Sequence, residues 1–221
     1  MLASAMDVLT HDIYKVATVS DWNRLSRKMK SGELLTRKIV LTKDITFHEK
    51  DEFVTDENGT ITGVKKGISS DKILGISTQT GTGIGLRVEF DGQGHTIRGF
   101  YCDNENGKQG ASGGLFALLL DGGQIKNLTV ADSYIRGGNL TGGLCGVFYP
   151  ETESTSKDSE GTDKKQSLIE NVTIENVAVD GKEIVGGILG YNSVGDEFKN
   201  CEVKDCIIKG NSYVGLFNGK S

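Results

Sequence analysis

The sequence is almost without proline, which occurs once in 221 residues, at Pro150. It has no run of 18 apolar residues, so we expect no membrane span. The 25 Lys and Arg residues are mixed with 30 Asp and Glu residues, and no basic patch is visible. This charge pattern argues against nucleic acid as a partner. Abundant glycine with so little proline also argues against a disordered linker or a collagen.

Cysteine is sparse, and its four residues show neither a CxxC spacing nor a Cys/His cluster. We therefore expect no zinc site, and no other metal or cofactor. The cysteines fall where related segments carry mainly apolar residues, which favours small core side chains, with a disulfide bond as the alternative; they are Cys102, Cys145, Cys201 and Cys206. His48 and Glu49 begin a sequence close to a zinc-protease motif, but Glu52 stands where the second His is needed.

Glycine is abundant, with 31 residues, and a Gly-Gly unit recurs along the chain. The repeat-turn glycines are Gly113 and Gly114, Gly142 and Gly143, and Gly186 and Gly187. A second unit surrounds Asn127 and returns at Asn171 and Asn200, which lie 44 and 29 residues further along in turn. Both units fit a period of about 29 residues with one insertion. The polar segment 150–167 fits that insertion and predicts a surface loop.

Within each repeat, the apolar positions change parity at Asn127 and again at Asp132. A strand keeps its inward face at a period of two, so each change marks a bend between short strands. Asn, Asp and Gly tolerate the left-handed backbone that such bends need. We predict that Asn127, Asn171 and Asn200 form a structural ladder, with side-chain amides bonded from repeat to repeat.

These patterns predict an all-β fold, a right-handed parallel β-helix (a solenoid) with an N-terminal capping helix. A β-propeller or a sandwich is the alternative. The predicted parts are an N-terminal segment 1–17 and a single β-helix domain 18–221, which has a capping helix 20–31, an excursion 50–82 and repeats from 86. Ser20 is the expected N-cap, and Trp22, Leu25 and Met29 share one helix face. Asn58-Gly59 predicts a hairpin.

The Gly-Gly-Leu/Ile-x-Gly units, read with the asparagine columns, resemble the GLUG-motif repeats of bacterial surface proteins. The opening helix, the strand from Lys38 and the segment 90–97 resemble the cap and first turns that precede such repeats. The resemblance covers roughly residues 14–48 and 86–221. It departs at Ala117 and Leu216, where glycines are expected. It implies secretion or bacterial cell-surface display and an adhesive or stalk role, and it transfers no catalytic residues.

The leading hypothesis is therefore a non-enzymatic secreted or cell-surface module, an adhesin or stalk segment with a glycan or host surface protein as partner. Four tyrosines either line a sugar-binding face or pack as ordinary residues: Tyr101, Tyr134, Tyr149 and Tyr191. The alternative is a polysaccharide lyase or glycoside hydrolase of the β-helix type, which needs paired carboxylates. The candidates, which also suit turns, are Asp91, Asp103, Asp121 and Asp132.

The last full repeat is expected to leave an uncovered edge at Cys201, Val203, Ile207 and Ile208. No capping element follows these residues, although solenoids need a terminal cap. The sequence therefore predicts the N-terminal part of a longer protein, with the rest of the same chain as a partner at this edge.

Overall fold

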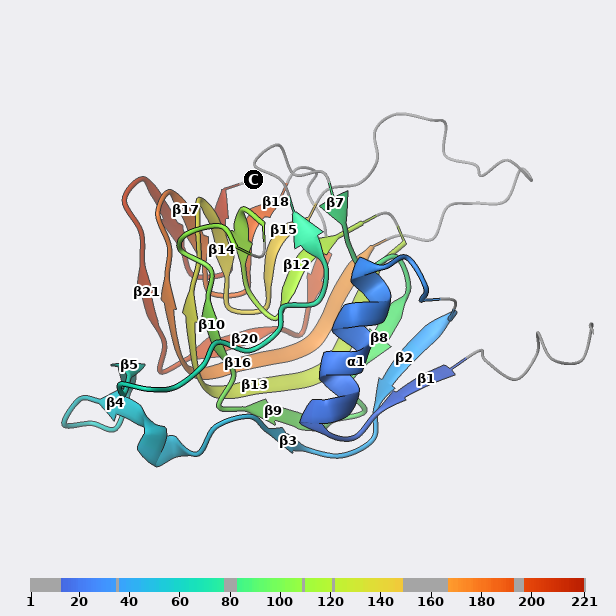
Figure 1. Cartoon of the computed structure of the whole chain (residues 1–221). Coiled ribbons are helices and arrows are strands. Elements are labelled where there is room, and N and C mark those ends of the chain that lie inside the picture. Colours follow the sequence, from blue (N-terminus) through green and yellow to red (C-terminus); the bar gives the residue numbers. More distant parts are fainter. Residues whose placement is uncertain are drawn as a thin grey trace, which may run out of the picture.

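The structure is a computed structural model, and it describes residues 13–34, 36–77, 83–108, 110–120, 122–148, 167–192 and 197–220. Strands dominate it, and the described part contains one α-helix, α1 (Val19–Lys30) (Figure 1). The predicted loop 150–167 lies outside the described residues except for Ser167, as does most of the predicted segment 1–17. No helix in the described ranges has the length and apolar character needed to cross a membrane.

The largest sheet is parallel and has 11 strands within the described residues. Its strands are β1 (Ile13–Val16), β2 (Lys38–Leu41), β3 (Ile45–Thr46), β8 (Glu89–Asp91), β9 (Thr96–Arg98), β10 (Tyr101–Asp103), β13 (Gln124–Arg136), β16 (Leu168–Asp180), β19 (Glu197–Lys199), β20 (Glu202–Lys204) and β21 (Ile207–Lys209). In Figure 1, β13 and β16 are the two long curved strands that run side by side.

Two smaller parallel sheets have four strands each in the described part of the chain. One contains β11 (Ser112–Gly113), β14 (Leu140–Gly142), β17 (Ile184–Gly186) and β22 (Tyr213–Gly215). The other contains β12 (Phe116–Leu119), β15 (Cys145–Phe148), β18 (Leu189–Asn192) and β23 (Asn218–Lys220). Each repeat thus contributes to all three parallel sheets. We call these sets layers: layer 1 is β8–β12, layer 2 β13–β15, layer 3 β16–β18 and layer 4 β19–β23.

The predicted fold class is wrong. We expected one right-handed parallel β-helix, but the described strands form five separate sheets, and two of these are antiparallel pairs. The pairs are β4 (Phe53–Thr55) with β5 (Ile61–Val64), and β6 (Ile76–Ser77) with β7 (Gly83–Ile84). The repeat pattern identifies which residues are equivalent, but it does not extend to residues 50–85. There the chain turns back on itself, and short connections favour antiparallel pairing.

The bends predicted at the asparagines lie inside long strands rather than between short ones. Asn127 and Asp132 fall within β13, and Asn171 and Asn176 fall within β16, all four with positive φ angles of 46–53°. In layer 4 the equivalent residues, Asn200 and Asp205, separate three short strands.

Helix α1 starts two residues earlier than it would if Ser20 were its N-cap. Its N-cap is Thr18, whose hydroxyl accepts the Asp21 amide at 3.1 Å and donates to the Asp21 carboxylate at 2.8 Å. The prediction of Ser20 as N-cap is wrong, because the Thr18 and Asp21 side chains already satisfy the first turn from a cap two residues ahead of Ser20.

The predicted inward face of α1 is confirmed, since Trp22, Leu25 and Met29 are all buried. The Trp22 ring makes edge contacts with four phenylalanine rings: Phe47, Phe90, Phe100 and Phe116. Its indole N–H donates to the Lys72 carbonyl at 2.7 Å, so the polar edge of the ring is satisfied as well. The helix therefore fills the core at the N-terminal end of the layers.

The hairpin predicted at Asn58-Gly59 is confirmed by the antiparallel pair β4–β5. Phe53 and Ile61 from this pair are buried against Tyr101 and Ala178 of the large sheet. The Ile61 amide also donates to the Asn176 side chain at 2.9 Å. The hairpin therefore covers part of the outer face of the large sheet.

Glycine is needed where consecutive layers approach each other most closely. A Cβ on Gly143 would collide with the carbonyl oxygen of Gly187 one layer on, and a Cβ on Gly187 would collide with that of Leu216. A Cβ on Gly142 or Gly186 would collide first with a carbonyl oxygen of its own layer, from Cys145 or Leu189, and then with backbone of the next layer. Gly113 faces the backbone of Gly137, and Gly114 has a φ of 149°. The Gly-Gly units therefore set the spacing between layers.

We predict that Gly143→Ala lowers the free energy of unfolding by roughly 1–3 kcal/mol, because backbone must move to admit the methyl group. Urea denaturation followed by circular dichroism measures this change. Gly63→Ala is the matched control, since its Cβ would meet only Val54 at 3.8 Å. Equal stability of the two variants would contradict the assigned role of the glycine pair.

Candidate functional site

The predicted asparagine ladder joins three successive layers by side-chain hydrogen bonds. The Asn171 amide nitrogen donates to the Asn127 amide oxygen at 2.9 Å, and Asn200 donates to Asn171 at 3.2 Å. Asn127 is half-buried, whereas Asn171 and Asn200 are exposed. The column therefore lies on an outer corner of the molecule, with all its amides pointing in one direction along the layers.

The ladder ends on a carboxylate that the sequence had suggested as a catalytic acid. Asn127 donates to Asp91 at 3.0 Å, and the Lys38 ammonium lies 2.8 Å from the other Asp91 oxygen. Burial would raise the pKa of Asp91, but hydrogen bonds from Lys38, Asn127 and the Gln93 amide outweigh it and lower the pKa below its usual value. Asp91 is thus an ionised anchor of the column.

A second column passes through Asp132 and Asn176. Asn176 donates to Asp132 at 2.6 Å, while the Arg98 guanidinium pairs with the other Asp132 oxygen. The Lys50 ammonium lies 3.6 Å from the same carboxylate. Lys50 precedes the β4–β5 hairpin, and Ile61 of the hairpin donates to Asn176, so this column fastens the hairpin to the large sheet.

Acidic and basic side chains alternate from layer to layer in two columns on the outer face of the large sheet, and Ala131 interrupts a third column. The three columns are Asp91, Lys126, Glu170 and Lys199; Arg98, Ala131, Glu175 and Lys204; and Asp103, Arg136, Asp180 and Lys209. Opposite charges directly across neighbouring strands stabilise a sheet, and like charges destabilise it. Sequence reasoning missed this pattern, although the 29-residue period places these residues in the same columns.

A partly buried histidine–carboxylate pair holds the segment that leads into the hairpin. His48 Nε2 lies 3.4 Å from Asp71 Oδ2, and His48 Nδ1 lies 3.6 Å from Glu52 Oε2. The Tyr101 amide donates to Asp71 at 2.9 Å. Burial raises the pKa of Asp71 to about 6, against the opposing effects of the Tyr101 amide and His48.

The candidate catalytic carboxylates are held by separate partners. Asp91 and Asp132 belong to the two asparagine columns, and Asp103 lies 3.4 Å from the Tyr101 hydroxyl. Asp121 lies outside the described residues. Among the described residues, the three placed carboxylates therefore stand in three different columns, and no contact joins any two of them.

The four predicted tyrosines do not make one open face. Tyr101 is only 7% exposed, and its ring lies 6.2 Å from that of Tyr134 beside the hairpin. Burial, with the neighbouring Asp103, raises the pKa of Tyr101 to about 12. Tyr191 packs on the main core instead, and Tyr149 lies outside the described residues.

The four cysteines are free thiols. Cys102 and Cys145 are fully buried, and burial raises the pKa of each to about 12. Cys201 and Cys206 are partly buried in layer 4, and burial raises their pKa values as well. High pKa values keep thiols protonated, so these side chains serve as packing groups.

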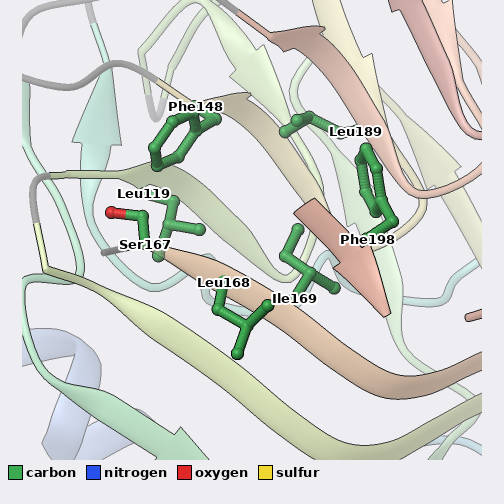
Figure 2. Close-up of a pocket in the computed structure, with 7 residues that line it drawn as sticks. All are labelled: Leu119, Phe148, Ser167, Leu168, Ile169, Leu189 and Phe198. Carbon is green, nitrogen blue, oxygen red and sulfur yellow. The ribbon is translucent and has the colours of Figure 1, made fainter. Parts of the chain in front are cut away.

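One pocket of the described residues lies between the sheets and is small. Figure 2 shows the side chains that line it. Its volume is about 10 Å³, which is at the lower limit for holding one water molecule. Its lining is mostly apolar and comprises Leu119, Phe148, Ser167, Leu168, Ile169, Leu189 and Phe198. A larger, open hollow of about 390 Å³ lies beside α1 and is lined by Asn23, Ser26, Arg27, Lys30 and Lys72. In the described ranges, no three His, Cys, Asp or Glu side chains gather as metal ligands would.

Comparison of the chain with family models, curated proteins and solved structures gave no match. The arrangement of its own residues is therefore the basis for assigning a role.

We predict that Asn171→Ala lowers the free energy of unfolding by roughly 1–3 kcal/mol, from two lost hydrogen bonds and a left-handed backbone that alanine disfavours. Asn171→Gly accepts that backbone but makes neither bond, so it separates the two effects. The contribution of the ladder is the difference between wild type and the glycine variant in urea denaturation. Unchanged stability in both variants would mean that the exposed amides contribute nothing.

Because the pKa of Asp71 is raised, we predict that the free energy of unfolding depends on pH. Its folded-state pKa of about 6 exceeds its usual value of 3.8, so the folded protein binds the proton more tightly. The contribution of Asp71 to the free energy of unfolding is therefore full below about pH 4 and is lost as the pH rises through about 6. Across this pH range, the free energy of unfolding of the wild type should fall by roughly 1–3 kcal/mol relative to that of Asp71→Asn.

Asp91→Asn is the control for this measurement, because the lowered pKa of Asp91 gives the opposite sign. The Asp91 contribution is present above about pH 4 and is lost as the pH falls through its folded-state pKa. Urea denaturation between pH 3 and pH 8 tests both variants. Parallel pH profiles for wild type and Asp71→Asn would refute the assignment.

Proposed function

We propose that this chain is a non-enzymatic structural module, a stalk segment of a secreted or surface-displayed bacterial protein. The observation that carries the proposal is the hydrogen-bonded column from Lys38 and Asp91 through Asn127 and Asn171 to Asn200. A polar column that bonds every layer to the next stiffens the stack along one direction. The secreted or surface location rests on the resemblance to GLUG-motif repeats.

The charged outer columns support the same role. Their acids and bases lie opposite each other on neighbouring strands, and Lys204 lies 3.5 Å from Glu175 within its column. Charges arranged in this way stabilise neighbouring layers, because opposite charges lie beside each other within the stack. A spacer needs this kind of surface, whereas an enzyme needs converging groups.

Adhesive binding to a glycan or a host surface protein is a further expectation of the resemblance. The described tyrosines give it little support, because Tyr101 lies under the hairpin and Tyr191 packs on the core. We therefore favour the stalk role. A glycan array with the intact chain would identify an adhesive role directly.

The proposal predicts no turnover of polysaccharides. Incubation with a panel of acidic polysaccharides should release neither reducing nor unsaturated ends above a heat-denatured control. Turnover by the native chain that Asp91→Asn or Asp103→Asn abolishes, with the circular dichroism spectrum retained, would establish the polysaccharide lyase or glycoside hydrolase alternative instead.

A further inference from the structure

Layer 4 presents an edge of the large sheet. In the described part of the chain, β19, β20 and β21 each pair with β16 on one side and with no strand on the other. The inward residues Val203 and Ile208 are partly exposed there, whereas their partners in layer 3, Ile174 and Val179, are fully buried. The edge therefore offers both backbone hydrogen-bonding groups and apolar surface.

All three charged columns end at this edge on a base. The last residues of the three columns are Lys199, Lys204 and Lys209, which lie five residues apart along the chain. The layer below carries Glu170, Glu175 and Asp180 at the same positions, and this acidic strand, β16, also faces Lys126 and Arg136 on its other side. The alternation therefore specifies an acidic strand as the next neighbour.

Leu216 restricts which polypeptide segments can pack against the edge of layer 4. It occupies the position of Gly143 and Gly187, where a carbonyl oxygen of the following layer takes the space of a Cβ. Leu216 has a side chain there and is 56% exposed. A complete further layer at the same spacing would bring a carbonyl oxygen onto that side chain. A single strand along the large sheet does not pass this corner.

A second copy of this chain fits the edge poorly. Two layer-4 edges placed together would bring lysine columns against each other. Among the described strands, β1 is outermost at the opposite edge, and its Lys15 lies in the column of Asp91 and Lys199. Head-to-tail stacking would therefore set lysine against lysine there. Like charges directly opposed on neighbouring strands are destabilising.

We propose that the edge of β19, β20 and β21 is a docking surface for an extended acidic segment of another polypeptide. The segment adds as one more parallel strand, with Asp or Glu opposite Lys199, Lys204 and Lys209 and apolar residues opposite Val203 and Ile208. Backbone hydrogen bonds give this mode its affinity, and the side-chain columns give it selectivity. The proposal is independent of the stalk role.

The chain itself supplies a probe of the required chemistry. A peptide with the sequence of Leu168–Asp180, acetylated and amidated to remove its terminal charges, carries the acids and the apolar residues in the right register. The control peptide has the same sequence with Glu170→Lys, Glu175→Lys and Asp180→Lys. Binding of each to the intact chain is measured by fluorescence anisotropy at low salt and located by amide shifts in NMR spectra.

We expect the acidic peptide to bind roughly tenfold or more tightly than the lysine peptide, with the preference fading as salt rises. The shifts should centre on residues 199–209. In a chain with Lys204→Gln and Lys209→Gln, the preference should fall to about twofold. Leu216→Gly, the matched control, should leave binding unchanged, because the peptide does not reach that corner.

Three results would overturn the proposal. One is equal binding of both peptides, or no binding of either at low salt. Another is a set of amide shifts away from β19–β21. The third is self-association of the chain without peptide in sedimentation experiments, which would make a second copy the occupant of the edge.

Discussion

Parallel strands in register place each side chain beside its equivalent on the neighbouring strand, about 4.8 Å away. Whatever one layer carries at a position, the next layer must accept at the same position. An apolar residue then stacks on an apolar residue without cost, as Phe90, Ile125 and Ile169 do in the core. Charged and polar residues need a specific arrangement, and most of the surface of this protein follows from that need.

The chain meets the constraint in three ways. Asparagine stacks on asparagine because one amide both donates and accepts, which lets Asn127, Asn171 and Asn200 repeat without change. Charged residues cannot repeat in this way, so acids alternate with bases in the columns through Lys126 and Arg136. Glycine occurs where the carbonyl group of one layer lies in the space that a side chain of the previous layer would fill, as at Gly143 and Gly187.

The same constraint decides where a partner can act. Within the stack, Lys126 and Arg136 already face Glu170 and Asp180 on the next strand, and the β4–β5 hairpin covers the tyrosines of layers 1 and 2. The edge of layer 4 is different, because its columns end on lysine and its strands pair on one side within the described residues. A mechanical role for the stack and a recognition role for its edge are therefore compatible.

The sequence by itself determined the equivalence of positions. The period of 29 residues, the asparagine column, the glycine pairs, the inward face of α1 and the hairpin at Asn58-Gly59 all follow from local pattern and turn chemistry. These features depend on residues that are close in sequence or that recur at a fixed spacing. The acid–base alternation also follows from the 29-residue period, because the period places these charged residues at equivalent positions on neighbouring strands.

Only the tertiary structure decided how the strands divide into sheets and what the excursion covers. The repeat does not extend to residues 50–85, so it could not indicate two antiparallel pairs. The roles of Asp91, Asp132 and Asp71 also lay beyond the pattern, because each depends on Lys38, Arg98 or His48, which lie between 23 and 53 residues away along the chain. Contacts of that kind are set by packing, and no local spacing encodes them.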